Sequence, residues 1–349
     1  MQIDGSNQLR FMRGRRLALA MLACGLAAQA SLTSAQSSMQ SPTQATQSSE
    51  PDFPSRAVRI VVPFPPGGST DITARLVAAQ LTKIWQQPVT VENKPGAAAS
   101  IGTEYVARAP PDGHTILLAT TALPISAATF EKLPFDPVRD LRPVLLVSTI
   151  PNVLVVNPTL PARTIGEFVD FARSNPGKLN FASPGVATGQ RLTFELLKQS
   201  AGIDVVHVPY KGGAPAGQAV LGGEVQSMIM NIAEALPLVQ ASRLRALAVT
   251  TRARQPKLPD VPTLDETVAR GIDTSVWQGV LVPAATPPAV IDRINRGWRE
   301  ALGAAEVGGR LEDMGMQVAA GSPADFKSFL AAEFDLWDRV AKAGKIRVE

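Results

Sequence analysis

Two glycine-rich loops hold the residue types that could bind an anion. The first is PFPPGGSTD at residues 63–71, between an apolar, β-branched run at 58–62 and an amphipathic stretch that predicts a helix. Its two glycines allow close backbone approach, and the Ser, Thr and Asp that follow are typical of helix N-termini. The free N–H groups of a first helical turn and the positive end of the helix dipole attract anions. The loop therefore predicts an anion site, although an ordinary capped strand-to-helix turn explains it equally well.

The second loop is SPGVATG at residues 183–189, and it repeats the arrangement of the first. It follows a predicted strand at 180–182 and precedes a helix that carries Leu192, Leu196 and Leu197 at helical spacing. The two loops begin about 120 residues apart, one in each half of the chain. This repetition indicates a binding site shared between two lobes.

Two charged side chains beside these loops leave alternatives open. Asp71 competes with an anionic ligand for the positive end of the first helix, so it either caps that helix or accepts a hydrogen bond from a donor group of the ligand. Arg191 is the only cation beside either loop, and it either contacts the ligand or pairs with Glu195 at i,i+4.

The chain has few residues suited to acid–base, thiol or metal chemistry. His114 and His207 are its only histidines and fall in different predicted lobes, so we expect neither a zinc site nor a His-dependent triad. The single cysteine, Cys24, lies within a predicted export signal, and no G-x-S-x-G elbow, dinucleotide fingerprint or P-loop lysine is present. We expect no enzymatic activity, cofactor or metal. A secreted hydrolase that uses Ser69 or Ser183 is a weak alternative, because we expect no histidine beside either serine.

The composition predicts an α/β protein with an aliphatic core. Of its 349 residues 45% are hydrophobic but only 5% aromatic, and short β-branched runs alternate with helical patterns after residue 51, which is typical of mainly parallel sheets. The net charge of +4 falls to +1 without residues 1–35, and no basic cluster is interleaved with aromatics, so we expect no nucleic-acid partner. Particular predictions are short, proline-bounded strands at 144–147 and 153–156, a return strand at 277–282, and helices at 288–302 and 323–343.

Residues 1–35 are similar to a secretory signal peptide. Four arginines at positions 10–16 precede an apolar run at 17–28, and AQA at 28–30 or TSA at 33–35 fits a cleavage site. The apolar run is too short for a stable membrane span, although a retained anchor is an alternative. Cys24 in MLACG weakly resembles a lipoprotein box, so lipidation there is a second alternative. Residues 36–52 are rich in Ser, Gln and Thr and predict a flexible lead-in.

A series of motifs covering nearly everything after residue 54 resembles one family. These motifs are PSRAVRIVVP at 54–63, PPGGSTD at 65–71, ENKPG at 92–96, DGHT at 112–115, HVPYKGG at 207–213, LAVT at 247–250 and PDVPT at 259–263. Together they resemble the Bug (Bordetella uptake) receptors, which are the TctC-type solute-binding proteins of tripartite tricarboxylate transporters. The resemblance implies a type 2 periplasmic binding-protein fold, with two α/β lobes joined by crossing strands and a ligand cleft between them. We expect lobe 1 to comprise residues 53–153 plus 275–349, and lobe 2 residues 154–274.

The resemblance also implies which residues bind a ligand. Members of the family hold small carboxylates through both loops, often with bridging waters. The second loop departs from the family pattern at two positions, with Ala187 for a usual Gly and Arg191 for a common His, and these changes put the identity of the acid in doubt. Asn231 stands where relatives often have Asp. The positions carried over are Phe64, Gly67, Gly68, Ser69, Thr70, Asp71, Ser183, Gly185, Ala187 and Thr188, with Thr120, Thr121, Asn231 and Arg191 as further candidates.

The function that the resemblance implies is capture rather than catalysis. We expect a monomeric periplasmic receptor that closes over a small organic acid and delivers it to the membrane permease subunits of a tripartite transporter. A ligand-sensing subunit that docks on a signalling receptor is the alternative, and the sequence does not separate the two.

Overall fold

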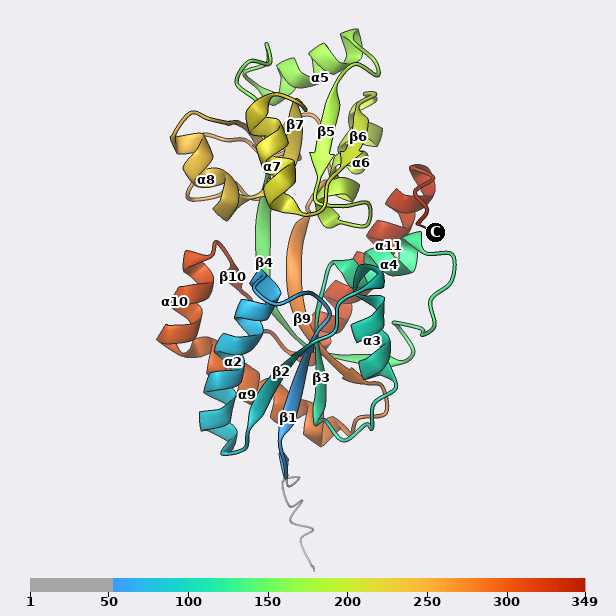
Figure 1. Cartoon of the computed structure of the whole chain (residues 1–349), viewed down its shortest axis with the longest axis vertical. Coiled ribbons are helices and arrows are strands. Elements are labelled where there is room, and N and C mark those ends of the chain that lie inside the picture. Colours follow the sequence, from blue (N-terminus) through green and yellow to red (C-terminus); the bar gives the residue numbers. More distant parts are fainter. Residues whose placement is uncertain (1–52, 349) are drawn as a thin grey trace, which may run out of the picture. The chain divides into compact units, whose positions relative to one another are not determined.

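The structure is a computed structural model that describes residues 53–348 (Figure 1). The predicted signal peptide, its cleavage site, Cys24 and the lead-in at 36–52 lie outside the described residues. Within the described part, no helix combines the length and the apolar character that a membrane span needs.

Strands and helices alternate along the chain, as the pattern of short apolar runs predicts. The strands are β1 (Val58–Val62), β2 (Val89–Asn93), β3 (Thr115–Thr120), β4 (Leu141–Val156), β5 (Asn180–Ser183), β6 (Val206–Pro209), β7 (Ser227–Asn231), β8 (Arg245–Val249), β9 (Ser275–Pro283) and β10 (Gln317–Val318). The helices are α2 (Ser69–Trp85), α3 (Ser100–Ala107), α4 (Ala122–Thr129), α5 (Ile165–Ser174), α6 (Gly189–Ala201), α7 (Gly213–Gly222), α8 (Ile232–Gln240), α9 (Pro288–Gly303), α10 (Ala305–Asp313) and α11 (Pro323–Ala343), with a 3-10 turn at Ala97–Ala99. The predicted C-terminal helices and the return strand are confirmed as α9, α11 and β9.

The strands are paired in the order β2-β1-β3-β9-β4-β7-β5-β6, with β8 and β10 also paired to β4. In the first half of this order β1 is parallel to β2 and β3, and β9 is antiparallel to both β3 and β4. In the second half β5, β6 and β7 are parallel to one another, and β7 is antiparallel to β4. Because β4 runs in the same direction as β3, the two sets of parallel strands run toward each other.

One long strand, β4, belongs to both halves of the fold. Its residues from Leu141 to Pro151 pair with β9, whereas those from Asn152 to Val156 pair with β7. The prediction of two short strands here is wrong, because β4 contains both Pro143 and Pro151 and continues through them. Pro151 lies opposite Ser275 at the end of the β9 ladder, just before β4 changes partner, and a missing N–H is tolerated at such a position. The crossing strands β4 and β9 are visible between the two groups of helices in Figure 1.

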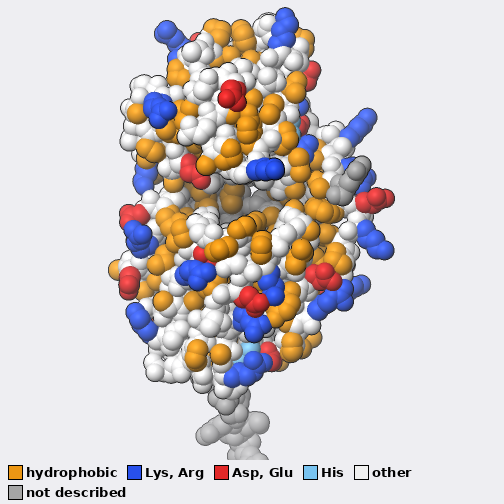
Figure 2. All heavy atoms as spheres, viewed as in Figure 1, with side chains coloured by type: hydrophobic (Ala, Val, Ile, Leu, Met, Phe, Trp, Pro, Cys, Tyr) orange, Lys and Arg blue, Asp and Glu red, His pale blue; other side chains and the backbone are white. Residues whose placement is uncertain are grey.

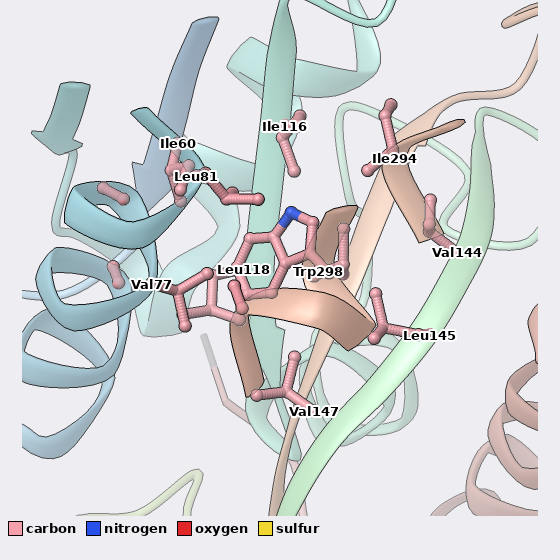
Figure 3. Packing of buried hydrophobic residues seen from close by; sticks show 14 of the residues in the cluster. Ile60, Val77, Leu81, Ile116, Leu118, Val144, Leu145, Val147, Ile294 and Trp298 are labelled. Atoms are coloured by element: carbon pink, nitrogen blue, oxygen red, sulfur yellow. The ribbon is translucent and has the colours of Figure 1, made fainter. Parts of the chain in front are cut away.

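Each half buries its own aliphatic core. In the first half Trp298 of α9 packs among β-branched and leucine side chains from α2, β1, β3 and β4 (Figure 3). Helices α3 and α11 cover the other face of the same strands, where Trp277 and Phe326 are buried. In the second half Phe181 stacks on Phe194 of α6 with ring centroids 4.0 Å apart, and α7 and α8 cover the opposite face. These cores fix the strand ends from which the two loops emerge.

Candidate ligand-binding site

The topology brings the carboxyl ends of two strand sets to the same place. Helices α2 and α4 follow β1 and β3 in the first half, and α6, α7 and α8 follow β5, β6 and β7 in the second. Since the two sets run toward each other, all five helices begin near the level where β4 and β9 cross. Helix N-termini carry free N–H groups and partial positive charge. Figure 2 shows a hollow in the molecular surface between the upper and lower halves of the view.

The first loop leaves the start of α2 open. Gly68 is the N-cap residue in an extended conformation, no side chain caps the helix, and the residues from Pro65 to Ser69 are exposed. Gly67 has a φ of +90°, which favours glycine, and no atom lies within 4 Å of a Cβ placed on it or on Gly68. The free space beside both glycines leaves room for a ligand against the backbone.

Asp71 braces this loop and does not cap α2, so the first of the two alternatives for this residue is wrong. Its carboxylate accepts hydrogen bonds from the Gly67 N–H and the Arg75 Nε, both at 2.9 Å, and from the Asn93 Nδ2, also at 2.9 Å. The hydrogen bond from Arg75 is the main reason why the pKa of Asp71 falls to about 2. The buried carboxylate is therefore ionised and already paired, and its charge opposes an incoming anion less than an unpaired one would.

In the second loop one side chain, that of Thr188, binds both the loop and the first turn of α6. Thr188 is the N-cap residue, and its Oγ1 accepts from the Arg191 N–H at 3.4 Å and donates to the Gly185 carbonyl at 3.0 Å. Ala187 packs against an apolar cluster that includes Ile125 of α4. The methyl group by which this chain departs from the family pattern therefore packs against a cluster to which both halves of the fold contribute.

Arg191 does not form the ion pair with Glu195 that one of the two alternatives predicted. Glu195 pairs with Lys198 at 3.2 Å, whereas Arg191 donates from Nη1 to the Val186 carbonyl at 2.6 Å. Burial is the main cause that lowers the pKa of Arg191 from its ordinary value, and the Arg191 Nε is buried without a partner among the described residues. The guanidinium thus binds the backbone of the second loop, which directly precedes the helix that carries Arg191.

The expectation that no histidine lies beside Ser183 is also wrong. Strands β5 and β6 are parallel with Phe181 opposite His207, and this register brings the His207 Nε2 to 2.6 Å from the Ser183 Oγ. The pair is not arranged as a nucleophile and base. The Ser183 side chain is fully buried and donates to the Gly185 carbonyl at 2.9 Å, and no carboxylate of the described residues hydrogen-bonds the other ring nitrogen of His207.

The remaining predicted residues lie around the same junction. Thr121 connects the two halves, because its Cγ2 is 3.4 Å from a Cβ placed on Gly189 and its Oγ1 accepts from the Trp277 N–H at 3.0 Å. Asn231 accepts from the Gln190 Nε2 at 3.4 Å, so α8 and α6 meet there. Thr120, at the end of β3, is buried and its Oγ1 accepts from the Ala122 N–H, while Phe64 is half-buried against the core of the first half.

Three residues near the junction were not among the predicted ligand-binding residues. These residues are Gln190, His207 and Gln278. Gln278 lies opposite Thr120 and is 1% exposed, and both polar atoms of its side chain are without a partner in the described residues. The sequence pointed only to His207, through the HVPYKGG motif. Gln190 and Gln278 reach the junction through contacts that are distant in sequence, with Asn231 and Thr120 respectively. No group of three or more His, Cys, Asp or Glu residues in the described part could hold a metal ion.

Comparison with known proteins gives the class and then the family. Two α/β lobes joined by crossing strands, with helix N-termini around the junction, are the type 2 periplasmic binding-protein fold. Residues 73–346 match the model of the tripartite tricarboxylate transporter family receptor. The chain belongs to this family, and the predicted resemblance is confirmed.

Relatives and solved structures agree with this assignment. The chain is 34% identical to the protein BugT of Bordetella pertussis over 292 residues, which are 83% of this chain and 90% of that one. A structure of R. palustris Rpa4515 with adipate is 33% identical with a TM-score of 0.74, and the match covers 84% of this chain and 99% of that one. MatC from Rhodopseudomonas palustris with bound malate is 32% identical with a TM-score of 0.71, over 82% and 99% of the two chains.

Proposed function

We propose that this receptor captures a small carboxylate between the two loops and releases it unchanged to the permease subunits of its transporter. The observation that carries the proposal is the convergence of five helix N-termini from opposed strand sets on one junction. Such an arrangement offers many backbone N–H donors to an anion, which suits its reversible capture. The adipate and malate in two solved relatives support a carboxylate ligand.

In the proposed mode of binding the two loops act as opposite jaws. The N–H groups at the start of α2, from Gly68 to Thr70, hold the ligand from one side, and those from Val186 to Gly189 hold it from the other. Asp71 keeps the first loop in shape because it occupies the Gly67 N–H, and Thr188 does the same for the second through Gly185. Closure excludes water and strengthens the hydrogen bonds to a charged group.

The proposal extends to lobe boundaries, export and partner. The change of partner along β4 near Pro151 and the start of β9 at Ser275 support lobes of 53–153 plus 275–349 and of 154–274. Export by the segment at 1–35 and a monomeric state fit a receptor that moves freely to a permease. A sensor subunit uses the same capture step and differs only in the protein on which the closed form docks.

A thermal-shift panel of mono-, di- and tricarboxylates tests the proposal. At least one acid, with adipate and malate the first to try, is expected to raise the melting temperature, because a ligand at 100 times its Kd stabilises the folded state by about 2.7 kcal/mol. Native mass spectrometry of the purified protein identifies any acid retained from the cell. If no acid of the panel changes the melting temperature and none is retained, the proposed function is wrong.

A further inference from the structure

The HVPYKGG motif, residues 207–213, hydrogen-bonds the start of the second loop. Its Tyr210 N–H donates to the Ser183 carbonyl at 2.9 Å, and its Gly212 N–H donates to the Pro184 carbonyl at 3.0 Å. The Gly185 and Val186 carbonyls are taken by Thr188 and by Arg191. Four consecutive carbonyls of the loop are therefore already bound, two by the motif and two by side chains at the start of α6. The backbone N–H groups of the first turn of α6 are left for a ligand.

The Ser183 side chain is the centre of this support. Its Oγ donates to the Gly185 carbonyl at 2.9 Å and accepts from the Gly185 N–H at 3.3 Å, so it holds both polar groups of that glycine. The same oxygen lies 2.6 Å from the His207 Nε2. Ser183 is fully buried, so the loss of this contact leaves a buried hydroxyl short of a partner, which costs free energy.

The His207 ring is fixed in position and uncharged at neutral pH. It packs on Phe181 with ring centroids 4.8 Å apart, and Phe181 in turn stacks on Phe194 of α6. Burial, followed by the charges of Arg191 and Lys198, lowers the pKa of His207 to about 4. A neutral imidazole ring that packs on two stacked phenylalanines can hold Ser183 in place without contributing charge to the site.

We propose that His207 is a positioning residue, which holds the second loop in its ligand-binding geometry through Ser183 and does not itself touch the ligand. This inference rests on the proposed function, because it assigns a role within the same site. The inference gives residues 207–210 of the HVPYKGG motif a structural role, which is to hold the second loop in place.

The experiment compares His207→Phe with His114→Phe in the full chain. His207→Phe keeps an aromatic ring on Phe181 but removes the Nε2, whereas His114 stacks on Phe53 with centroids 5.0 Å apart, in the first half of the fold. Hydrogen–deuterium exchange is the first readout, without ligand. We expect faster exchange of the amides at 185–190 in His207→Phe only. Unchanged exchange there in His207→Phe, or the same change in His114→Phe, overturns the inference.

Calorimetric titration with adipate and with malate is the second readout. For an acid that the wild type binds, His207→Phe should weaken binding about three- to tenfold, the worth of one hydrogen bond, while His207→Gln restores part of it and His114→Phe has no effect. Ser183→Ala combined with His207→Phe should cost no more than Ser183→Ala alone, because Ser183→Ala already removes the contact with His207 together with both bonds to Gly185. Additive losses would contradict the inference.

The pH dependence separates positioning from charge. Wild-type affinity should be nearly constant between pH 8 and 6, because His207 stays neutral and both probe acids remain mostly dianions throughout this range. An affinity that rises as the pH falls through 6.5, and does not rise in His207→Gln, would mean that His207 binds the acid as a cation. If the wild type binds neither acid, nor any other in the panel, the proposed function fails, while the exchange experiment still decides whether His207 orders the loop.

Discussion

At the scale of single residues, the site is built from side chains that serve the backbone. Asp71, Thr188 and Arg191 all use their polar atoms on loop N–H or carbonyl groups within five residues of themselves. Such local hydrogen bonds fix the direction in which the N–H groups of a loop point. They also reduce the entropic cost of ordering the loop when a ligand binds. The polar residues beside the loops thus act mainly through geometry.

Asp71→Asn should lower the free energy of unfolding by about 1–2 kcal/mol at pH 7. The pKa of Asp71 is about 2 in the folded protein against 3.8 ordinarily, so its ionised form stabilises the fold above pH 4 and this part is lost as the pH falls toward 2. The exposure of Arg75 reduces the effect. Urea unfolding from pH 7 to pH 3 should show the two proteins converging. Asp338→Asn, which removes the exposed i,i+4 pair with Lys342, is the control and should cost only a few tenths of a kcal/mol.

At the scale of elements, the crossing strand β9 is held against α11 by a close approach. Gly279 faces Phe326, and the Trp277 Nε1 donates to Glu333 of α11 at 2.7 Å. The strand that connects the two lobes is therefore anchored on a helix of the first. Gln278, between these two residues of β9, is paired with Thr120 at the end of β3.

Gly279→Ala should destabilise the protein by about 1–3 kcal/mol, because the added methyl group would overlap the Phe326 ring in a packed core. Gly222→Ala is the matched control, since nothing lies within 4 Å of a Cβ there and the residue ends helix α7. That change should leave stability unchanged or raise it by about 0.5 kcal/mol. Equal effects of the two substitutions in urea unfolding would show that the close approach is not what limits residue 279.

At the scale of the whole molecule, an apolar cluster connects the two lobes beside the second loop. Leu192 of α6 packs with Ile125 of α4 and with Trp337 and Ile346 near the C-terminus. The Gln199 Nε2 also donates to the Val340 carbonyl at 3.3 Å. The end of the chain therefore contributes to the position of the second lobe.

Leu192→Ala should lower stability by about 2–5 kcal/mol and loosen both sides of this cluster. Hydrogen exchange should then rise in α6 and also in α11 near Trp337. Leu197→Ala removes an equally buried leucine from the core of the second lobe, so it should cost as much stability while leaving α11 protected. If exchange in α11 does not change in Leu192→Ala, the cluster does not couple the lobes.

What the sequence by itself determined is what depends on neighbours along the chain. The strand–loop–helix units around residues 63–71 and 183–189, the C-terminal helices and the family were all readable, because periodicity, glycines and helix-start residues act locally. Only the tertiary structure decided that β4 continues through Pro151, that His207 meets Ser183 across a parallel register, and that Thr121 lies against Gly189. These contacts join residues from different strands or different lobes. Their partners are chosen by strand pairing and core packing, which no local pattern records.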